Sequence, residues 1–242
     1  MHRSSQRRHG VSARRWWALT SPTFPRLTAS LSVAGSATPT VGVLALQGDF
    51  REHIAVLTAL GAHAIPVKRV DELDRVSGLV IPGGESTVMD KLSRMFGLAE
   101  PLKAAVASGM PVYGTCAGLI MLADTVLDAI VGQQTIGGFD LVVRRNAFGS
   151  QLDSFETDLD IAVLGEAPMH AVFIRAPVVE AVGNRAHVLA SLADGRVVAV
   201  EQGNLIGTSF HPEMTGDTRF HEYFLGKVLA TSRSGAALHD HG

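Results

Sequence analysis

Short apolar runs alternate with amphipathic segments through the first half of the chain. Apolar stretches occur at residues 41–46, 64–67, 79–81 and 112–113. Between them, apolar positions recur at helical spacing in Phe50, Ile54, Leu57 and Leu60, in Val88, Leu92 and Met95, and through residues 102–106. Strands that alternate with helices in this way predict an α/β fold of three layers, with a central and mostly parallel sheet flanked by helices.

The ends of the predicted strands carry distinctive turns. Asp49 and Glu52, after the first strand, have the spacing of a capping box at a helix start. Two glycine-rich turns, at residues 82–87 and 114–118, each follow a strand and precede a helix. Because ligands of parallel sheets sit at the carboxyl ends of the strands, we expect both turns to line one crevice.

After Ala123 the helical signal weakens, and shorter strand-like runs replace it. These runs lie at residues 141–143, 172–174, 188–190, 197–200 and 205–210. Asp194-Gly195 between two of them indicates a hairpin. We therefore expect a smaller antiparallel strand region beside the parallel sheet. A closing helix with Phe220, Phe224 and Val228 would complete one domain over residues 39–231, followed by a flexible tail at 232–242.

The first 38 residues differ from the remainder of the 242-residue chain. They lack regular periodicity and contain six arginines and no acidic residue. This composition predicts a disordered basic leader, and a wrongly assigned start codon would explain it equally well. A transit peptide or a twin-arginine signal through Arg14 and Arg15 is the alternative, although Pro22 and Pro25 interrupt any apolar region of a signal sequence.

Composition narrows the function classes. Without the six leader arginines, 15 basic residues face 23 acidic ones, which disfavours nucleic-acid binding. No apolar run approaches the length of a membrane span, and we expect no membrane association. The single cysteine excludes an intrachain disulfide framework and is typical of a reducing compartment, so a cytoplasmic location is expected.

That cysteine, Cys116, occupies the turn between an apolar strand and a helix. The small residues Gly114, Ala117 and Gly118 allow the chain to fold back tightly, as in the nucleophile elbow of hydrolases. A helix N-terminus favours the thiolate, which is the reactive form of cysteine. The spacing therefore makes Cys116 a candidate nucleophile. The alternative is that Cys116 is only a small apolar side chain buried in the core.

His211 and Glu213 follow the last strand-like run. In an extended segment, residues two apart project to the same face, and Pro212 stiffens the backbone between them. A carboxylate could then orient an imidazole that accepts a proton from a thiol, as in a Cys-His-Glu triad. The alternative is an ordinary polar histidine, which we expect for most of the other nine. No further residues supply the ligand spacing of a zinc site, so no metal is expected.

Polar groups near the two turns could bind a substrate. The turn at Pro82-Gly-Gly-Glu-Ser86 has the composition of an anion cradle, although it could be only a tight turn. If it faces Cys116, the N–H groups of Gly84 and Ala117 could form an oxyanion hole. Arg145 and Arg175 lie near strand ends and could pair with a carboxylate, although solvated arginines are the default.

Taken together, these motifs resemble those of a known family. Gly114-Thr-Cys-Ala-Gly118 with His211-Pro-Glu213 resembles the class I, or triad, glutamine amidotransferases. Further motifs narrow the resemblance to the glutaminase subunit of pyridoxal 5'-phosphate synthase, and it extends from about residue 41 to about residue 229. These further motifs lie at residues 47–48, 82–87, 145–149, 153–156 and 173–177.

The resemblance implies a reaction and a set of site residues. Cys116 would attack the side-chain amide of glutamine, His211 would protonate the departing ammonia, and Glu213 would hold His211. Water would then hydrolyse the glutamyl thioester to glutamate. The family's glutamine-binding positions fall on Gly84, Glu85, Ser86, Arg145, Ile174 and Arg175.

The resemblance also implies a partner. Family members deliver ammonia to a (β/α)₈-barrel synthase in a hetero-oligomer and are poorly active until it docks. Pyridoxal 5'-phosphate would be the product of that complex, so no cofactor is expected in this chain. Two alternatives remain: a glutaminase serving another ammonia-dependent synthase, and a non-catalytic regulatory subunit. The motifs at 146–156 and 173–177 argue against the first, and the intact Cys116, His211 and Glu213 argue against the second.

Overall fold

The first half of the chain alternates strands with helices, as the apolar pattern predicts. The computed structural model describes residues 38–145 and 154–239. Its first elements are β1 (Thr40–Leu44), α1 (Phe50–Ala59), β2 (His63–Val67), α2 (Val70–Leu73), β3 (Gly78–Ile81), α3 (Ser86–Met95), α4 (Ala99–Ala107) and β4 (Val112–Thr115). The expected strands and helices are confirmed, and the one-turn helix α2 is an addition to them.

The second half is dominated by strands. Its elements are α5 (Ala117–Leu122), β5 (Ala123–Leu127), β6 (Phe139–Arg144), β7 (Ser154–Leu159), η1 (Ala162–Leu164), β8 (Met169–Ile174), β9 (Val178–Val182), β10 (His187–Ser191), β11 (Val197–Gln202), β12 (Leu205–Thr208), η2 (Pro212–Met214) and α6 (Arg219–His239). Strands β10 and β11 pair antiparallel across the turn at Asp194-Gly195, so the predicted hairpin is confirmed.

One large sheet organises the fold, with the strand order β2-β1-β3-β4-β12-β11-β9-β6-β5 and β10 paired to β11. The strands from β2 to β12 in this order are parallel. The pairs of β11 with β12 and β9, and of β9 with β6, are antiparallel. Strands β7 and β8 form a separate antiparallel sheet. The predicted mostly parallel sheet with a smaller antiparallel region is confirmed.

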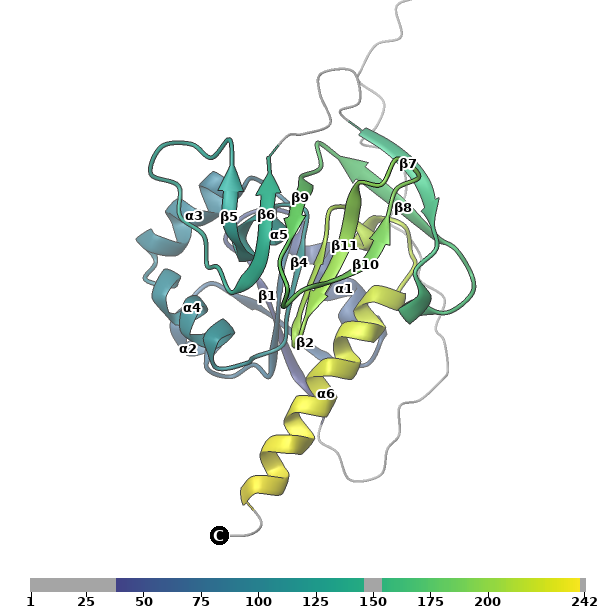
Figure 1. Cartoon of the computed structure of the whole chain (residues 1–242). Coiled ribbons are helices and arrows are strands. Elements are labelled where there is room, and N and C mark those ends of the chain that lie inside the picture. Colours follow the sequence, from purple (N-terminus) through teal and green to yellow (C-terminus); the bar gives the residue numbers. More distant parts are fainter. Residues whose placement is uncertain (1–37, 146–153, 240–242) are drawn as a thin grey trace, which may run out of the picture.

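Helices cover both faces of the parallel strands (Figure 1). On one face, Leu79 and Ile81 of β3 pack in a core with residues of α3, α4 and α5. On the other face, Val80 of β3 and Tyr113 of β4 pack with Leu57 of α1 and with the buried side of α6. Because neighbouring residues of a strand point to opposite faces, strands that are covered on both sides read as continuous apolar runs.

Helix α3 presents a different face to the core from the one its apolar residues suggest. Val88 and Met95 are 39% and 74% exposed. The buried face instead carries Met89 together with the polar residues Asp90 and Ser93. The Asp90 carboxylate is satisfied there by an ion pair with Arg94 and by a backbone N–H, so a polar face can be buried at this position.

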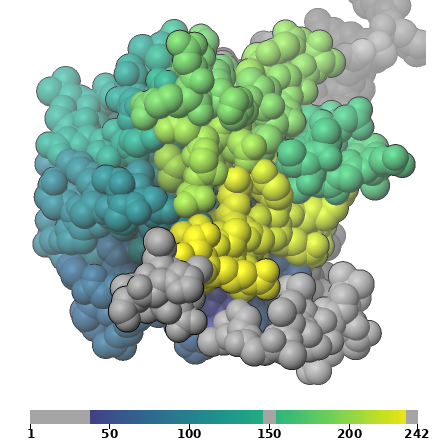
Figure 2. Space-filling view, turned by 60° about the horizontal axis from the view of Figure 1, so that its bottom comes forward, coloured from purple at the N-terminus to yellow at the C-terminus, as the bar shows by residue number. Residues whose placement is uncertain are grey.

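Helix α6 is longer than expected, because it runs to His239 and includes residues 232–239 of the predicted tail. That stretch contains no proline, and Ser232 and Ser234 donate hydrogen bonds to carbonyls one turn earlier. The helix leaves the body of the molecule toward the end marked C in Figure 1. Nearer its start it adjoins β11 (Figure 2), where Glu201 accepts a 2.6 Å hydrogen bond from Tyr223.

None of the described helices, α6 included, combines the length and the apolar character needed to cross a bilayer. Residues 1–37 of the predicted leader, which was expected to span residues 1–38, and the last three residues lie outside the described part of the chain.

Candidate active site

Cys116 lies on the sharp turn between β4 and α5 that the sequence predicts. Its φ of 49° and ψ of −103° place a non-glycine residue in a strained backbone conformation, and its side chain is almost buried. The flanking glycines allow the close approach of neighbouring backbone, because a Cβ on Gly118 would lie 2.0 Å from the carbonyl oxygen of Ile81. A Cβ on Gly114 would lie 2.6 Å from the Gly118 backbone. The tight turn therefore depends on both glycines.

His211 and Glu213 come together just after β12. The His211 ring nitrogen Nδ1 lies 2.7 Å from Glu213 Oε1, and both side chains are buried. The local backbone differs from the expected extended segment, because Pro212–Met214 form the 3₁₀ helix η2. Proline suits the first turn of a helix, where its missing N–H has no partner to lose. The carboxylate thus reaches His211 across a tight turn.

The charges of this pair stabilise one another. Burial tends to lower the pKa of His211, but hydrogen bonds to Cys116 and Glu213 outweigh it and raise the pKa to about 11. Burial tends to raise the pKa of Glu213, but the neighbouring imidazoles of His53 and His211 lower it to about 2. An imidazolium that touches both the thiol and a carboxylate is the charge arrangement of a Cys-His-Glu triad.

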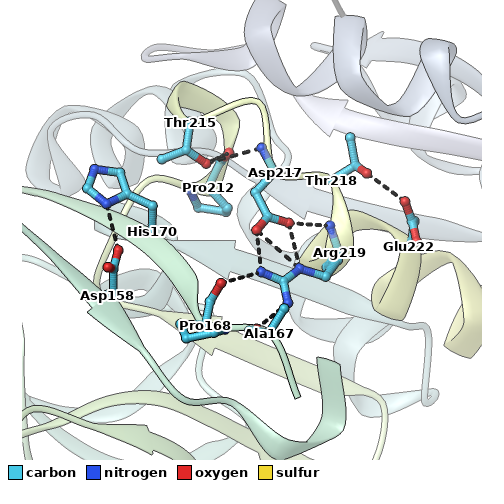
Figure 3. Close-up of polar contacts among 10 residues, drawn as sticks. All are labelled: Asp158, Ala167, Pro168, His170, Pro212, Thr215, Asp217, Thr218, Arg219 and Glu222. Carbon is cyan, nitrogen blue, oxygen red and sulfur yellow. Dashed lines mark hydrogen bonds and ion pairs between the residues drawn. The ribbon is translucent and has the colours of Figure 1, made fainter. Parts of the chain in front are cut away.

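The segment that carries this pair is fixed at both of its ends. The His211 backbone N–H donates a 2.9 Å hydrogen bond to the carbonyl oxygen of Val172 in β8. Farther along, the Arg219 guanidinium donates to the carbonyls of Ala167 and Pro168 at 2.6 and 2.9 Å and pairs with Asp217 (Figure 3). Because the guanidinium is planar and rigid, this fork ties the start of α6 to the loop before β8.

The glycine-rich turn after β3 packs against the triad histidine. A Cβ on Gly83 would lie 2.4 Å from His211 Cε1, so the turn approaches the ring as closely as glycine permits. Gly84 has a φ of +147°, and the next amide, that of Glu85, donates a 2.7 Å hydrogen bond to Gln47 Oε1. Ala117 begins α5, where N–H groups have no partner within the helix. An oxyanion hole of Gly84 and Ala117 stays a prediction that this placement allows.

Three of the predicted glutamine-binding residues form one polar cluster. Glu85 caps α3 through hydrogen bonds with Thr87 and Val88 and pairs with Arg145 at 2.8 Å. Gln133 bridges Ser86 and Arg145, because its side-chain amide donates to Ser86 Oγ at 3.1 Å and accepts from Arg145 Nη1 at 2.7 Å. Gln133 was not expected from the sequence, since it lies in the loop between β5 and β6 with no motif to mark it.

Ile174 and Arg175 lie at the carboxyl end of β8. The Cys116 sulfur is 3.9 Å from the carbonyl oxygen of Ile174, so the strand end borders the candidate nucleophile. Arg175 has a φ of 43° and an exposed side chain that makes no hydrogen bond or ion pair with another described residue. Arg175 therefore lies next to the site but makes no contact of these kinds with the polar cluster. The motif residues 146–149 and Asp153 lie outside the described residues.

Asp49 also faces the triad. Its carboxylate makes no cap hydrogen bond with α1, so the predicted capping box is wrong. The carboxylate instead lies 3.8 Å from His211 Nδ1, and burial first, then the charge of Glu213, raise its pKa. Across the described residues, Asp49, His211 and Glu213 are the set with metal-ligand spacing, within 4.8 Å of one another. His211 Nδ1 is already bonded to Glu213, which favours a hydrogen-bonded pair over a metal centre.

Comparisons with known proteins agree with this geometry. Residues 43–230 match the SNO glutamine amidotransferase family. A relative from Leifsonia xyli subsp. xyli, named pyridoxal 5'-phosphate synthase subunit PdxT, is 70% identical over 196 residues, which are 81% of this chain and 98% of the relative. A relative of the same name from Streptomyces avermitilis is 59% identical over 193 residues, 80% of this chain and 96% of the relative.

Solved structures show the same fold. A crystal structure described as a glutamine amidotransferase has a TM-score of 0.73 and 46% identity, and the match covers 78% of this chain and 98% of that one. A structure of PurLQS from Thermotoga maritima has a TM-score of 0.54 at 16% identity, with 78% of this chain and 99% of that one covered. At this identity, the second structure supports the fold alone.

Proposed function

This chain belongs to the SNO glutamine amidotransferase family, and we propose that it is the glutaminase subunit of a pyridoxal 5'-phosphate synthase. The observation that carries the proposal is the strained Cys116 beside a buried His211, whose pKa it helps to raise and which Glu213 holds at 2.7 Å. The reaction is the hydrolysis of L-glutamine to glutamate and ammonia.

The proposed reaction has two halves. The Cys116 sulfur attacks the side-chain amide carbon of glutamine, and the charge that develops on the amide oxygen is met by the N–H groups of Gly84 and Ala117. The carbon–nitrogen bond then breaks while His211 gives a proton to the leaving ammonia. In the second half, His211 takes a proton from water as the water attacks the thioester, and the carbon–sulfur bond breaks. Glutamate leaves, and the cysteine is restored.

The polar cluster beside the triad would hold the other end of glutamine. In this proposal, Arg145 and Arg175 bind the α-carboxylate of glutamine, while Glu85 and Ser86 bind its α-amine. The Glu85–Arg145 ion pair supports this assignment, because it presents one charge of each sign, as a zwitterionic amino acid requires. The backbone of Ile174, at the edge of the cysteine, would limit the space for the amide.

A synthase partner is part of the proposal, since the relatives are named as subunits of pyridoxal 5'-phosphate synthase. We further propose that the partner is a (β/α)₈ barrel in a hetero-oligomer in the cytoplasm, and that it receives the ammonia directly. The thiol and the imidazole suffice for amide hydrolysis, so the proposed reaction uses no metal or cofactor in this chain.

The test is a reconstitution with a purified barrel-type synthase. We expect glutamate release to rise strongly when the synthase is added, and pyridoxal 5'-phosphate to form from glutamine, ribose 5-phosphate and glyceraldehyde 3-phosphate. Ammonium salts in place of glutamine should support synthesis by the synthase alone, which serves as the control. A chain that releases no glutamate in the presence of an active synthase would refute the proposal.

A further inference from the structure

Two fully buried histidines that the proposed reaction does not use lie next to the triad. His53 in α1 and His221 in α6 are both 0% exposed, and His53 Nδ1 is 2.9 Å from His221 Nε2. The His221 ring makes a T-shaped contact with Tyr113, with ring centroids 5.9 Å apart and planes at 78°. Buried imidazoles from two distant helices are costly unless their polar atoms are matched, so their placement calls for a role.

The other nitrogen of His53 faces the triad carboxylate. His53 Nε2 lies 3.2 Å from Thr115 Oγ1 and 3.5 Å from Glu213 Oε2. Oxygen Oε1 of Glu213 is bonded to His211, whereas Oε2 makes no hydrogen bond within the described part of the chain. Among the described residues, the polar group that faces Oε2 is therefore His53 Nε2, and His53 belongs to helix α1.

The pair of histidines is uncharged near neutral pH. Burial lowers the pKa of His53, and burial followed by the proximity of His53 lowers the pKa of His221 to about 3. A single proton must therefore lie between His53 Nδ1 and His221 Nε2, and its position decides which nitrogen of His53 carries the other proton.

One of the two arrangements suits the site. If His221 donates to His53 Nδ1, the proton of His53 is on Nε2, where it points at Thr115 and at the Glu213 carboxylate. In the opposite arrangement, a lone pair of His53 would face that carboxylate. It would also leave a buried N–H at His221 Nδ1, for which no acceptor exists among the described residues.

We propose that His53 is a positioning residue of the triad, which directs its Nε2–H at Glu213 Oε2 and so holds the carboxylate toward His211, while His221 fixes the tautomer of His53. The inference deepens the proposed glutaminase function and rests on it. The resulting chain runs from α6 through α1 to the catalytic pair, so these two helices would set the orientation of His211.

The first test compares two substitutions of His53 in the reconstituted complex. His53→Gln keeps an amide N–H that can reach Glu213, whereas His53→Leu removes every donor. We expect kcat for glutamate release to fall about 10- to 100-fold in His53→Leu, with KM for glutamine nearly unchanged, and to recover in part in His53→Gln. Equal kcat values for wild type and His53→Leu would overturn the proposal.

A double-mutant cycle shows whether His53 acts through the carboxylate. Glu213→Gln removes the anion, so adding His53→Leu to it should cost little further activity. Fully multiplicative losses would mean that His53 acts independently of Glu213, and would overturn the role. A wild-type complex without any glutaminase activity would refute the proposed function itself, which separates the two failures.

The last test needs no variant that must stay active. Long-range nitrogen–proton NMR spectra of the histidine rings in the full chain report which nitrogen of each ring carries hydrogen. We expect His53 to be neutral with its proton on Nε2 near neutral pH, its signals being identified by their loss in His53→Gln. A His53 protonated on Nδ1, or on both nitrogens, would overturn the proposal even if every leucine variant failed to fold.

Discussion

The backbone N–H of Cys116 donates a 2.7 Å hydrogen bond to the carbonyl oxygen of Thr208. Thr208 is also the parallel partner of Thr115, so the strand that ends in the cysteine is in register with the strand that leads to His211. The pairing of β4 with β12 therefore brings together a thiol and an imidazole that are far apart in the sequence. The catalytic geometry follows from the register of two central strands.

Replacing Cys116 with alanine should abolish glutamate release while the complex with the synthase still forms. The substitution removes the nucleophile but little packing, because Cβ is kept and one sulfur atom is lost. Coupled detection of glutamate, together with co-elution of the two proteins, measures both effects. The Cys116→Ala complex should still make pyridoxal 5'-phosphate from ammonium salts. Substantial glutaminase turnover in a pure sample would contradict the assignment of the nucleophile.

Gly118→Ala should damage the turn at Cys116. The new Cβ would lie 2.0 Å from the Ile81 carbonyl oxygen, which belongs to backbone and cannot rotate away. We expect the free energy of unfolding to fall by about 1–3 kcal/mol or more, as for other overpacked sites, and glutaminase activity to fall with it. Urea unfolding and glutamate release measure the two effects.

Gly226→Ala in α6 is the matched control for that substitution. A Cβ at Gly226 has nothing within 4 Å, so the change should stabilise the helix by about 0.5–1 kcal/mol and leave the activity intact. Equal stability losses in both variants would mean that the clash with Ile81 is not the cause.

The parts of the site that share one local segment could be predicted from the sequence. Cys116 was marked by its own neighbours, since Gly114 and Gly118 define a strand, a turn and a helix within a few residues. The pairing of Glu213 with His211 was also expected, although through an extended segment and not a 3₁₀ turn. The spacing of His211 and Glu213 does not determine the backbone conformation at Pro212, so the 3₁₀ turn could not be predicted from it.

The residues that were missed depend on long-range contacts. Gln133 lies in a loop, and its role appears only when Ser86 and Arg145 reach it from other elements. His53 did give a signal, because it precedes Leu57 by one helical turn and so lies on the apolar side of α1. The burial of His53 could thus have been predicted from the sequence, but its contact with His221 could not.

Gln133→Ala should weaken the binding of glutamine more than it slows the reaction. The side chain holds Ser86 and Arg145 in place, so its loss leaves the arginine with its ion pair to Glu85. Losing hydrogen bonds to a charged group costs about 1.5 kcal/mol, which corresponds to a KM about tenfold higher with kcat largely kept. Steady-state kinetics of the complex measure both values. A reduced kcat at unchanged KM would show that Gln133 serves the triad instead.

Acid should destabilise the fold through the two buried histidines before it affects the triad pair. Burial lowers the pKa of His53, and it lowers the pKa of His221 to about 3, whereas a histidine of the unfolded chain has a pKa of about 6.5. Below that value the unfolded state binds protons that the folded state excludes. Stability should then fall with decreasing pH by up to about 1.4 kcal/mol per pH unit for each of the two rings.

The window between about pH 6.5 and about pH 5.5 isolates this effect best. Glu213 is largely ionised there in both states, because its pKa is about 2 in the folded state and about 4.3 in an unfolded chain. His211, with a pKa of about 11, is protonated in the folded state and becomes so in the unfolded state. Urea unfolding across the window measures the slope, which His221→Gln should reduce by about 1.4 kcal/mol per pH unit. If the slope of His221→Gln equalled that of the wild type, the buried His221 ring would not be excluding a proton in this window, which would contradict the uncharged state of the two histidines.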